Sequence, residues 1–302
     1  METHLVPGAR FVDPKVLARV KDLELLAKSV VDGFINGLHR APYFGASIDF
    51  AEHRGYVAGD DIRRVDWRLY ARTDRYYIKQ YEADTNANLS VLVDVSKSMG
   101  FASQGVSKLE YAKFLAACIA YLSHRQRDRV GIVTFDSDIV SHVPPSAKHF
   151  NVLLHTLDRA VPERPGRLLA NLRLIAEHFK RRSIVALISD LYESPDELLD
   201  VLKPYSFLGN DLVVFHVLDP AEIEFPYTEP SRFVDLESGE EVPVVPEGFA
   251  APYRKLMQEH ISALRSKCSD ARIDYVMLDT SKPLDEALFH YLGNRERLMR
   301  VR

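Results

Sequence analysis

The feature of this sequence that most constrains its fold is a regular alternation of short apolar runs and helical patterns, which begins after residue 88. The apolar runs have the length of buried strands and are expected to form them at residues 89–93, 130–135, 184–189, 212–218 and 273–278. Segments with helical spacing lie between and after these runs, at residues 109–123, 152–157, 168–179, 197–202, 253–267 and 284–292. This alternation predicts parallel crossover connections, and therefore an α/β fold with a doubly wound, mostly parallel sheet.

Two segments depart from the alternation. Residues 139–143 are expected to form an edge strand, which Pro144 and Pro145 should end. Residues 221–250 contain several prolines and are expected to form a hairpin excursion from the main domain.

The N-terminal part of the chain has a different character. Asp13 and Pro14 mark a helix start, and the apolar spacing that follows predicts one amphipathic helix over residues 13–38. Residues 40–84 are rich in glycine and aromatic side chains, with a strand expected at residues 76–78. We therefore expect a small α+β extension at residues 1–86, followed by the main domain at residues 87–302.

The composition is that of an ordinary globular protein, with 46% hydrophobic and 27% charged residues among 302. With 39 basic and 43 acidic residues, the net charge of −4 gives no global attraction to nucleic acid or to an anionic membrane. The two cysteines, Cys118 and Cys268, lie far apart in the sequence, which fits a reducing compartment and excludes a cysteine-based zinc site. No signal peptide is visible, and no apolar stretch approaches the roughly 20 residues of a membrane helix, so we expect a cytoplasmic location.

The residues that follow two of the predicted strands are candidates for a metal site. Asp94, Ser96 and Ser98 follow the first strand at alternate positions, and Asp190 follows the strand at residues 184–189. In a doubly wound sheet, the carboxyl ends of the strands meet at one edge, where ligands bind. Carboxylate and hydroxyl oxygens suit Mg²⁺ or Ca²⁺. The alternative is that Asp94 and the serines form only a helix cap and a tight turn.

The Asp94-x-Ser96-x-Ser98 pattern resembles the metal-ion-dependent adhesion site of von Willebrand factor A domains, and Asp190 matches the second acidic position of that family. Further segments resemble one family in particular, the bacterial domain-of-unknown-function family 58. The resemblance extends from about residue 35 to residue 292, and the segments that carry it are residues 45–50, 54–56, 59–63, 66–67, 71–74, 125–131 and 189–190.

The resemblance implies a von Willebrand factor A-like fold and a non-enzymatic protein-interaction module. In adhesion sites of this kind, a bound Mg²⁺ or other divalent cation keeps one coordination position open for a carboxylate of the partner. Members of the family are linked to MoxR-type AAA+ ATPases, and such an ATPase is the expected partner. The resemblance further implies an accessory role in the metal-linked assembly or maturation of other proteins.

The sequence departs from the adhesion-site pattern at the third ligand. A threonine is usual there, but this chain has Gly166, Arg167 and Leu168, which carry no hydroxyl group. Arg167 is a permanent cation that cannot ligate a metal, so if it points inward it either repels Mg²⁺ or replaces it by pairing with the carboxylates. If Arg167 points outward, the ion depends on serines, carboxylates and water. Asn171 is a further candidate to supply an oxygen.

A second candidate surface lies in the N-terminal extension, where arginines alternate with aromatic residues. Such a pattern is typical of nucleic-acid binding, but acidic residues match the basic ones in this stretch, so we expect no nucleic-acid partner. The segment is expected to pack on the sheet as a salt-bridged collar. If this segment has a function of its own, we expect it to be a docking surface for a protein. The expected hot spots are Arg63, Arg64, Asp66, Trp67 and Arg72.

The alternative function is that of an enzyme, a Mg²⁺-dependent phosphohydrolase with Asp94 as nucleophile. Haloacid-dehalogenase-like phosphatases place an aspartate similarly, but they have a second aspartate as acid/base where this chain has Ser96. A serine hydroxyl cannot take that role at neutral pH. Neither Ser96 nor Ser98 lies in a Gly-x-Ser-x-Gly motif. We therefore expect no catalytic residues.

Overall fold

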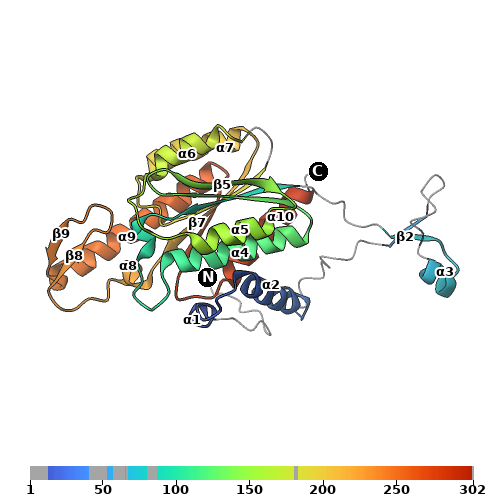
Figure 1. Cartoon of the computed structure of the whole chain (residues 1–302), viewed down its shortest axis with the longest axis horizontal. Coiled ribbons are helices and arrows are strands. Elements are labelled where there is room, and N and C mark those ends of the chain that lie inside the picture. The colour runs from blue at the N-terminus through green and yellow to red at the C-terminus, as the bar shows by residue number, and fades with distance from the viewer. Residues whose placement is uncertain are drawn as a thin grey trace.

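The computed structural model describes residues 13–40, 53–56, 65, 67–79, 87–179 and 183–300. Its main body is a six-stranded sheet in the order β10-β7-β6-β3-β4-β5 (Figure 1). The strands are β3 (Asn88–Asp94), β4 (Arg129–Phe135), β5 (Ile139–Ser146), β6 (Ile184–Ser189), β7 (Asp211–Leu218) and β10 (Asp274–Asp279). All neighbouring strands run parallel except β4 and β5. The predicted mostly parallel α/β fold is confirmed.

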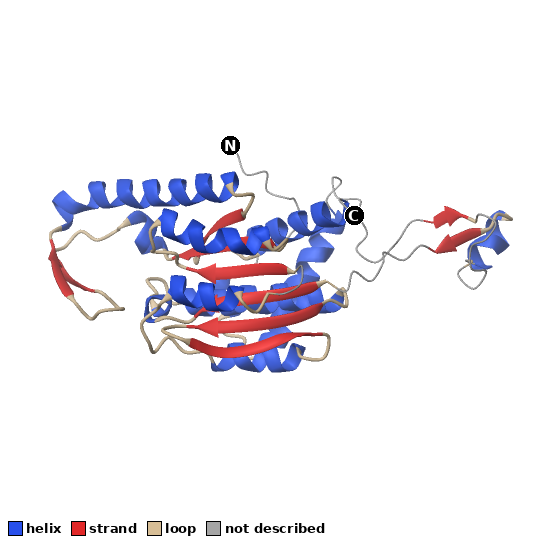
Figure 2. Ribbon diagram, turned by 90° about the horizontal axis from the view of Figure 1, so that it is seen from above, coloured by secondary structure: helices blue, strands red, loops and turns tan. Residues whose placement is uncertain are grey.

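Helices cover both faces of this sheet, as Figure 2 shows. In the central strand β3, Val91 and Val93 face one core, which includes residues of α4 (Lys108–Arg125), α5 (Phe150–Arg159) and α10 (Asp285–Arg300). Leu92 faces the other core, which includes residues of α6 (Leu168–Ala176), α7 (Pro195–Phe207) and α9 (Pro246–Asp270). Because both faces are covered, the central strands are apolar at nearly every position, as parallel strands require.

The order of the strands fixes the place where a ligand can bind. From β3 the chain adds β4 and β5 on one side, then returns to place β6, β7 and β10 on the other. The carboxyl ends of β3 and β6 therefore flank the point where the direction of winding reverses. Open α/β sheets bind ligands in the crevice at such a point.

The N-terminal helix differs from the prediction, because residues 13–38 contain two helices instead of one. They are α1 (Pro14–Leu17) and α2 (Leu23–Arg40). The Asp22 carboxylate accepts hydrogen bonds from the amides of Glu24 and Leu25, which starts a new helix at this point. α2 packs on α4, and its buried side chains join the core on that face of the sheet.

The edge strand also differs from the prediction. β5 does not end at Pro144 and Pro145 but continues through them to Ser146. A proline is tolerated here because β5 is an edge strand and its free side needs no hydrogen-bond donor. The ladder shifts register at this point, and a Cβ atom on Gly131 would lie 2.7 Å from the Pro145 nitrogen. Only glycine allows the two strands to approach so closely.

A two-stranded hairpin lies near the start of α9, within residues 221–250 (Figure 1). It consists of β8 (Ser231–Val234) and β9 (Glu241–Val244), which pair antiparallel, and it follows α8 (Pro220–Glu224). In the N-terminal extension, β1 (His53–Gly55) pairs antiparallel with β2 (Tyr77–Lys79), and α3 (Trp67–Thr73) lies between them in the sequence. None of the described helices combines the length and apolarity that a membrane span requires.

Candidate functional site

The Asp94 carboxylate is the centre of the site, at the carboxyl end of β3. Its Oδ1 accepts a hydrogen bond of 2.9 Å from the Ser96 amide, and its Oδ2 accepts one of 2.7 Å from the Ser189 hydroxyl at the end of β6. The hydroxyl oxygens of Ser96 and Ser98 lie 3.1 Å apart. The motif therefore folds back on its own carboxylate and gathers three oxygen-bearing side chains.

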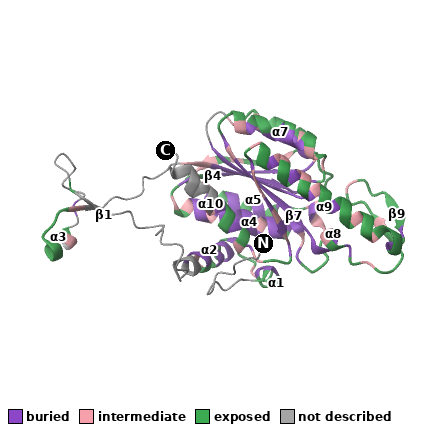
Figure 3. Ribbon diagram, turned by 180° about the vertical axis from the view of Figure 1, so that it is seen from behind, coloured by how far each residue is buried: buried purple, intermediate pink, exposed green. Residues whose placement is uncertain are grey.

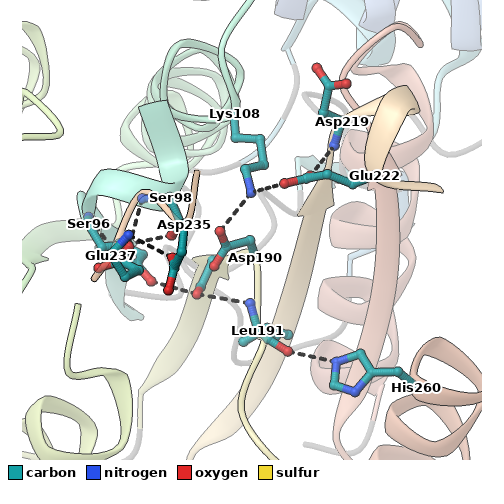
Figure 4. A network of polar contacts seen from close by, with 12 residues as sticks. Ser96, Ser98, Lys108, Asp190, Leu191, Asp219, Glu222, Asp235, Glu237 and His260 are labelled. Atoms are coloured by element: carbon teal, nitrogen blue, oxygen red, sulfur yellow. Dashed lines mark hydrogen bonds and ion pairs between the residues drawn. The ribbon is translucent and has the colours of Figure 1, made fainter. Parts of the chain in front are cut away.

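Asp190, the second predicted carboxylate, is paired with Lys108, which was not among the predicted site residues. Lys108 Nζ lies 2.8 Å from Asp190 Oδ2 and 2.6 Å from Glu222 Oε1 (Figure 4). Lys108 is completely buried. Burial alone would lower its pKa, but the charges of Asp190 and Glu222 outweigh burial and raise the pKa above its usual value. The site therefore contains a resident, charged ammonium group.

Two helix caps hold this ion-pair network in place. Ser107 and Glu110 form a capping box at the start of α4, which puts Lys108 at the first position of that helix. Asp219 and Glu222 form another at the start of α8, where the second Glu222 oxygen accepts from the Asp219 amide at 2.8 Å. Glu222 is thus held from both sides.

Asp94 itself has no cationic partner among the residues that the structure describes. Burial and the negative charge of Asp190 raise the pKa of Asp94 to about 7, and the hydrogen bonds from Ser96 and Ser189 offset only part of this rise. Burial also raises the pKa of Glu193 to about 7, with smaller contributions from neighbouring carboxylates. Lys108 already serves two carboxylates, so negative charge is in excess around Asp94.

The loop that replaces the usual threonine packs tightly against the serine loop. The Lys97 amide donates to the Arg164 carbonyl at 2.9 Å. A Cβ atom on Gly166 would lie 2.9 Å from the Ser96 Cβ, so the approach requires glycine at this position. The two loops therefore form a single surface.

Arg167 and Asn171 support this loop. The Arg167 amide and the Asn171 side-chain nitrogen both donate to the Asp136 carbonyl, at 2.9 and 2.7 Å. Arg167 is exposed, and within the described part of the chain its guanidinium forms no ion pair with Asp94 or Asp190. The cation beside Asp190 is therefore Lys108, and Asn171 anchors the loop through its amide group.

One more carboxylate reaches the site from a distant part of the sequence. Glu237, in the turn between β8 and β9, accepts a hydrogen bond of 2.7 Å from the Ser98 amide through Oε1. Its Oε2 accepts another of 2.7 Å from the Gly166 amide. Figure 4 shows Glu237 beside Ser96 and Ser98, on the side of Asp190 away from Lys108.

The oxygens of Asp94, Ser96 and Ser98 are the hard donors that Mg²⁺ prefers, and the excess negative charge at Asp94 favours a cation. The residues therefore fit a divalent ion. Within the described residues, no group of three or more His, Cys, Asp or Glu side chains could hold a metal. A cation here would thus need hydroxyl groups and water as ligands in addition to Asp94.

Four of the residues at this edge were predicted from the sequence: Asp94, Ser96, Ser98 and Asp190. Lys108, Glu222 and Glu237 were not predicted. The Ser107–Glu110 capping pattern could have placed Lys108 at the start of a helix, whereas no local pattern links Glu237 to residues so far away in sequence.

The predicted docking residues are only partly covered by the structure. Arg63, Arg64 and Asp66 lie outside the described residues. Trp67 and Arg72 belong to α3, where Trp67 is 55% exposed and Arg72 is also exposed. A large aromatic residue exposed to this extent is available to a partner.

The chain matches a known protein family over most of its length. A family model described as "Protein of unknown function DUF58" matches residues 52–261. Uncharacterized protein Rv1480 of Mycobacterium tuberculosis is 29% identical over 233 residues, which cover 75% of this chain and 73% of that protein. Uncharacterized protein Mb1516 of Mycobacterium bovis matches to the same extent.

Three solved structures resemble the chain at lower identity. An aerotolerance-related membrane protein from Bacteroides fragilis is 18% identical, with a TM-score of 0.48 over 67% of this chain and 96% of that one. BatB from Bacteroides thetaiotaomicron is 17% identical, with a TM-score of 0.48 over 70% and 99%. The SpRpn10 VWA domain is 14% identical, with a TM-score of 0.40 over 67% and 93%.

Proposed function

This chain belongs to the DUF58 family, and we propose that it is a non-enzymatic protein-interaction module that receives an acidic side chain of a partner at the carboxyl edge of β3 and β6. The observation that carries this proposal is the buried Asp94 carboxylate, which lacks a cationic partner among the described residues and lies beside two serine hydroxyls. A site of this kind attracts a cation, and a bound cation attracts a carboxylate.

Asp94, Ser96 and Ser98 would hold the divalent cation, preferably Mg²⁺, as a degenerate adhesion site without the usual threonine. When bound, the ion supplies a positive charge and an open coordination position for an oxygen of the partner. The chain's own residues prepare the site. Ser189 and the Ser96 amide orient the Asp94 carboxylate, and Lys108 holds Asp190 in place and neutralises part of its charge.

The partner that we propose is a MoxR-type AAA+ ATPase, with this chain as its accessory in the assembly or maturation of other proteins in the cytoplasm. The support is the family resemblance of the sequence. The exposed Trp67 and Arg72 would provide a second contact with the same partner.

Isothermal titration with Mg²⁺ tests the metal part of the proposal. The wild type should bind with measurable heat, and Asp94→Ala should lose it because the carboxylate of the proposed cation site is removed. Asp138→Ala is the matched control, since Asp138 is an exposed carboxylate in the loop after the neighbouring strand β4. Equal heats from the wild type and Asp94→Ala would reject the metal.

Capture of the purified ATPase tests the partner part. Asp94→Ala should recover less ATPase than the wild type, and Asp138→Ala should recover as much. Unchanged recovery with Asp94→Ala would show that this edge of the sheet is not the contact.

A further inference from the structure

We propose that the backbone amides of Ser98 and Gly166 form a carboxylate-binding site that works without a metal, and that Glu237 of the β8–β9 hairpin is its tethered ligand. An acidic side chain of a partner would have to displace Glu237 before it could bind. Only the identity of this incoming carboxylate rests on the function proposed above.

The Glu237 carboxylate makes the contacts expected of a carboxylate ligand bound at these two amides. Each of its two carboxylate oxygens accepts one amide hydrogen bond of 2.7 Å, from Ser98 and from Gly166. Hydrogen bonds of this length to an ionised acceptor are about twice as strong as neutral ones. The two donors come from loops that are 68 positions apart in sequence, so the site exists only because the loops pack together.

The packing of these loops presents the two amides as a pair. The hydrogen bond between the Lys97 amide and the Arg164 carbonyl joins the loops, and Gly166 lets them approach to a distance that a Cβ atom would prevent. The amides need no rearrangement to receive a carboxylate. Any planar carboxylate could make the same two contacts, whether it belongs to this chain or to another.

The turn that carries Glu237 is itself well ordered by hydrogen bonds. The Asp235 carboxylate accepts from the Glu237 amide at 2.9 Å and from the Ser238 hydroxyl at 2.6 Å. Gly239 adopts a φ of +76°, which favours glycine, and its amide donates to the Asp235 carbonyl. Glu237 is half-buried, whereas the residues on either side of it are exposed. The turn therefore directs this one carboxylate inward.

The hairpin is attached in a way that would let it leave the site. Its strands β8 and β9 pair with each other and not with the central sheet, and Figure 3 shows them largely exposed. Its base is held by aromatic contacts, with ring centroids 5.6 Å apart for Phe225 and Phe233 and 4.9 Å apart for Phe225 and Tyr253. Segments with few buried contacts open at low free-energy cost. Displacement of Glu237 would leave the main core intact.

Because Glu237 is part of the same chain, it competes with any incoming carboxylate for the two amides. Intramolecular ligands on short connections act at effective concentrations of roughly millimolar. An incoming carboxylate must exceed this competition, so a free acid should bind poorly to the wild type and better when Glu237 is removed.

The test uses the full chain, labelled for amide NMR, after metal ions have been removed with a chelating resin and with no soluble chelator in the buffer. Sodium acetate is titrated against sodium chloride at constant ionic strength, and the Ser98 and Gly166 amide resonances are followed. The variants are Glu237→Ala and Glu237→Gln, with Glu240→Ala as the matched control, because Glu240 is an exposed acid of the same hairpin.

In Glu237→Ala, both amides should shift saturably, with half-saturation at an acetate concentration at least tenfold lower than in the wild type. Glu237→Gln should lie between the two, because an amide offers only one acceptor oxygen. Glu240→Ala should match the wild type. The proposal is overturned if the amides of Glu237→Ala do not respond, if they respond only when Mg²⁺ is added, or if the wild type responds equally. Since no partner is present, this result is independent of whether ATPase capture succeeds.

Discussion

Lys108 and Asp190 form a buried ion pair, with 2.8 Å between Nζ and Oδ2, across the two elements that flank the candidate site. The lysine begins α4 and the aspartate follows β6, so the pair joins a helix to the edge of the sheet. The second acidic position of the site thus has its own cation. The charge that remains to be compensated belongs to Asp94.

The first prediction concerns the stability that depends on Lys108. In Lys108→Met, the buried carboxylates of Asp190 and Glu222 lose their cation, and the free energy of unfolding should fall by about 3–5 kcal/mol. Urea denaturation measures this change. Lys203→Met is the control, because Lys203 pairs with Asp200 on the surface, and the loss there should stay within about 0.5 kcal/mol. Similar losses in both variants would contradict the account.

The sheet could be predicted from the sequence because its strands are buried on both faces. The run at residues 184–189 has the same bounds as β6, since every residue of that strand is buried and polar residues follow it. Proline was a poor guide to the end of β5, because an edge strand does not need the hydrogen bonds that proline removes. The split of the N-terminal helix depended on a single cap at Asp22.

The site was predicted only as far as its residues follow strand ends. Asp94 and Asp190 could be placed together because parallel strands bring their carboxyl ends to one edge. Lys108 and Glu237 could not, because their roles depend on how a helix and a hairpin pack over that edge. The local sequence pattern also could not show whether the Arg167 side chain points into the site or into solvent. In the structure Arg167 is exposed.

The second prediction concerns His216, which is completely buried in β7. Burial, with a smaller effect of His260, lowers the pKa of His216 to about 3 from an ordinary value of 6.5. As the pH falls, the imidazole of His216 is therefore protonated in the unfolded chain at a higher pH than in the folded chain. The contribution of neutral His216 is fully present above pH 6.5 and decreases by about 1.4 kcal/mol per pH unit as the pH falls toward 3.

The measurement for His216 is the free energy of unfolding of the wild type and of His216→Gln between pH 7 and about pH 4.5. The difference between the two should shrink as the pH falls, because only the wild type loses this contribution. His155→Gln, which changes an exposed histidine of α5, should follow the wild type. A difference that is constant with pH would show that His216 is not held neutral.

The third prediction concerns the close contact between Gly166 and Ser96. In Gly166→Ala, the added Cβ would force the two loops apart, and the free energy of unfolding should fall by about 1–3 kcal/mol. Gly248→Ala is the control, because no atom lies within 4 Å of a Cβ added there in α9, and stability should stay equal or rise by up to about 1 kcal/mol. Thermal or urea denaturation measures the free energy of unfolding of both variants. An equal change in Gly166→Ala and Gly248→Ala would contradict a close contact at Gly166.

The fourth prediction concerns the enzymatic alternative. Turnover of p-nitrophenyl phosphate with Mg²⁺ should be no higher for the wild type than for Asp94→Asn, because Ser96 stands where a phosphatase of this type needs a second carboxylic acid. Turnover that exceeds the background and disappears in Asp94→Asn would instead support a phosphohydrolase.

The fifth prediction is the affinity of the purified MoxR-type AAA+ ATPase for the wild type, Asp94→Asn, Glu237→Ala and Asp138→Asn, measured as Kd with Mg²⁺ present. This measurement tests most directly the claim that an acidic side chain of the partner binds at the edge of β3 and β6. We expect Asp94→Asn to weaken binding at least tenfold, Glu237→Ala to strengthen it, and Asp138→Asn to leave it unchanged. The same Kd for all four proteins would contradict the account.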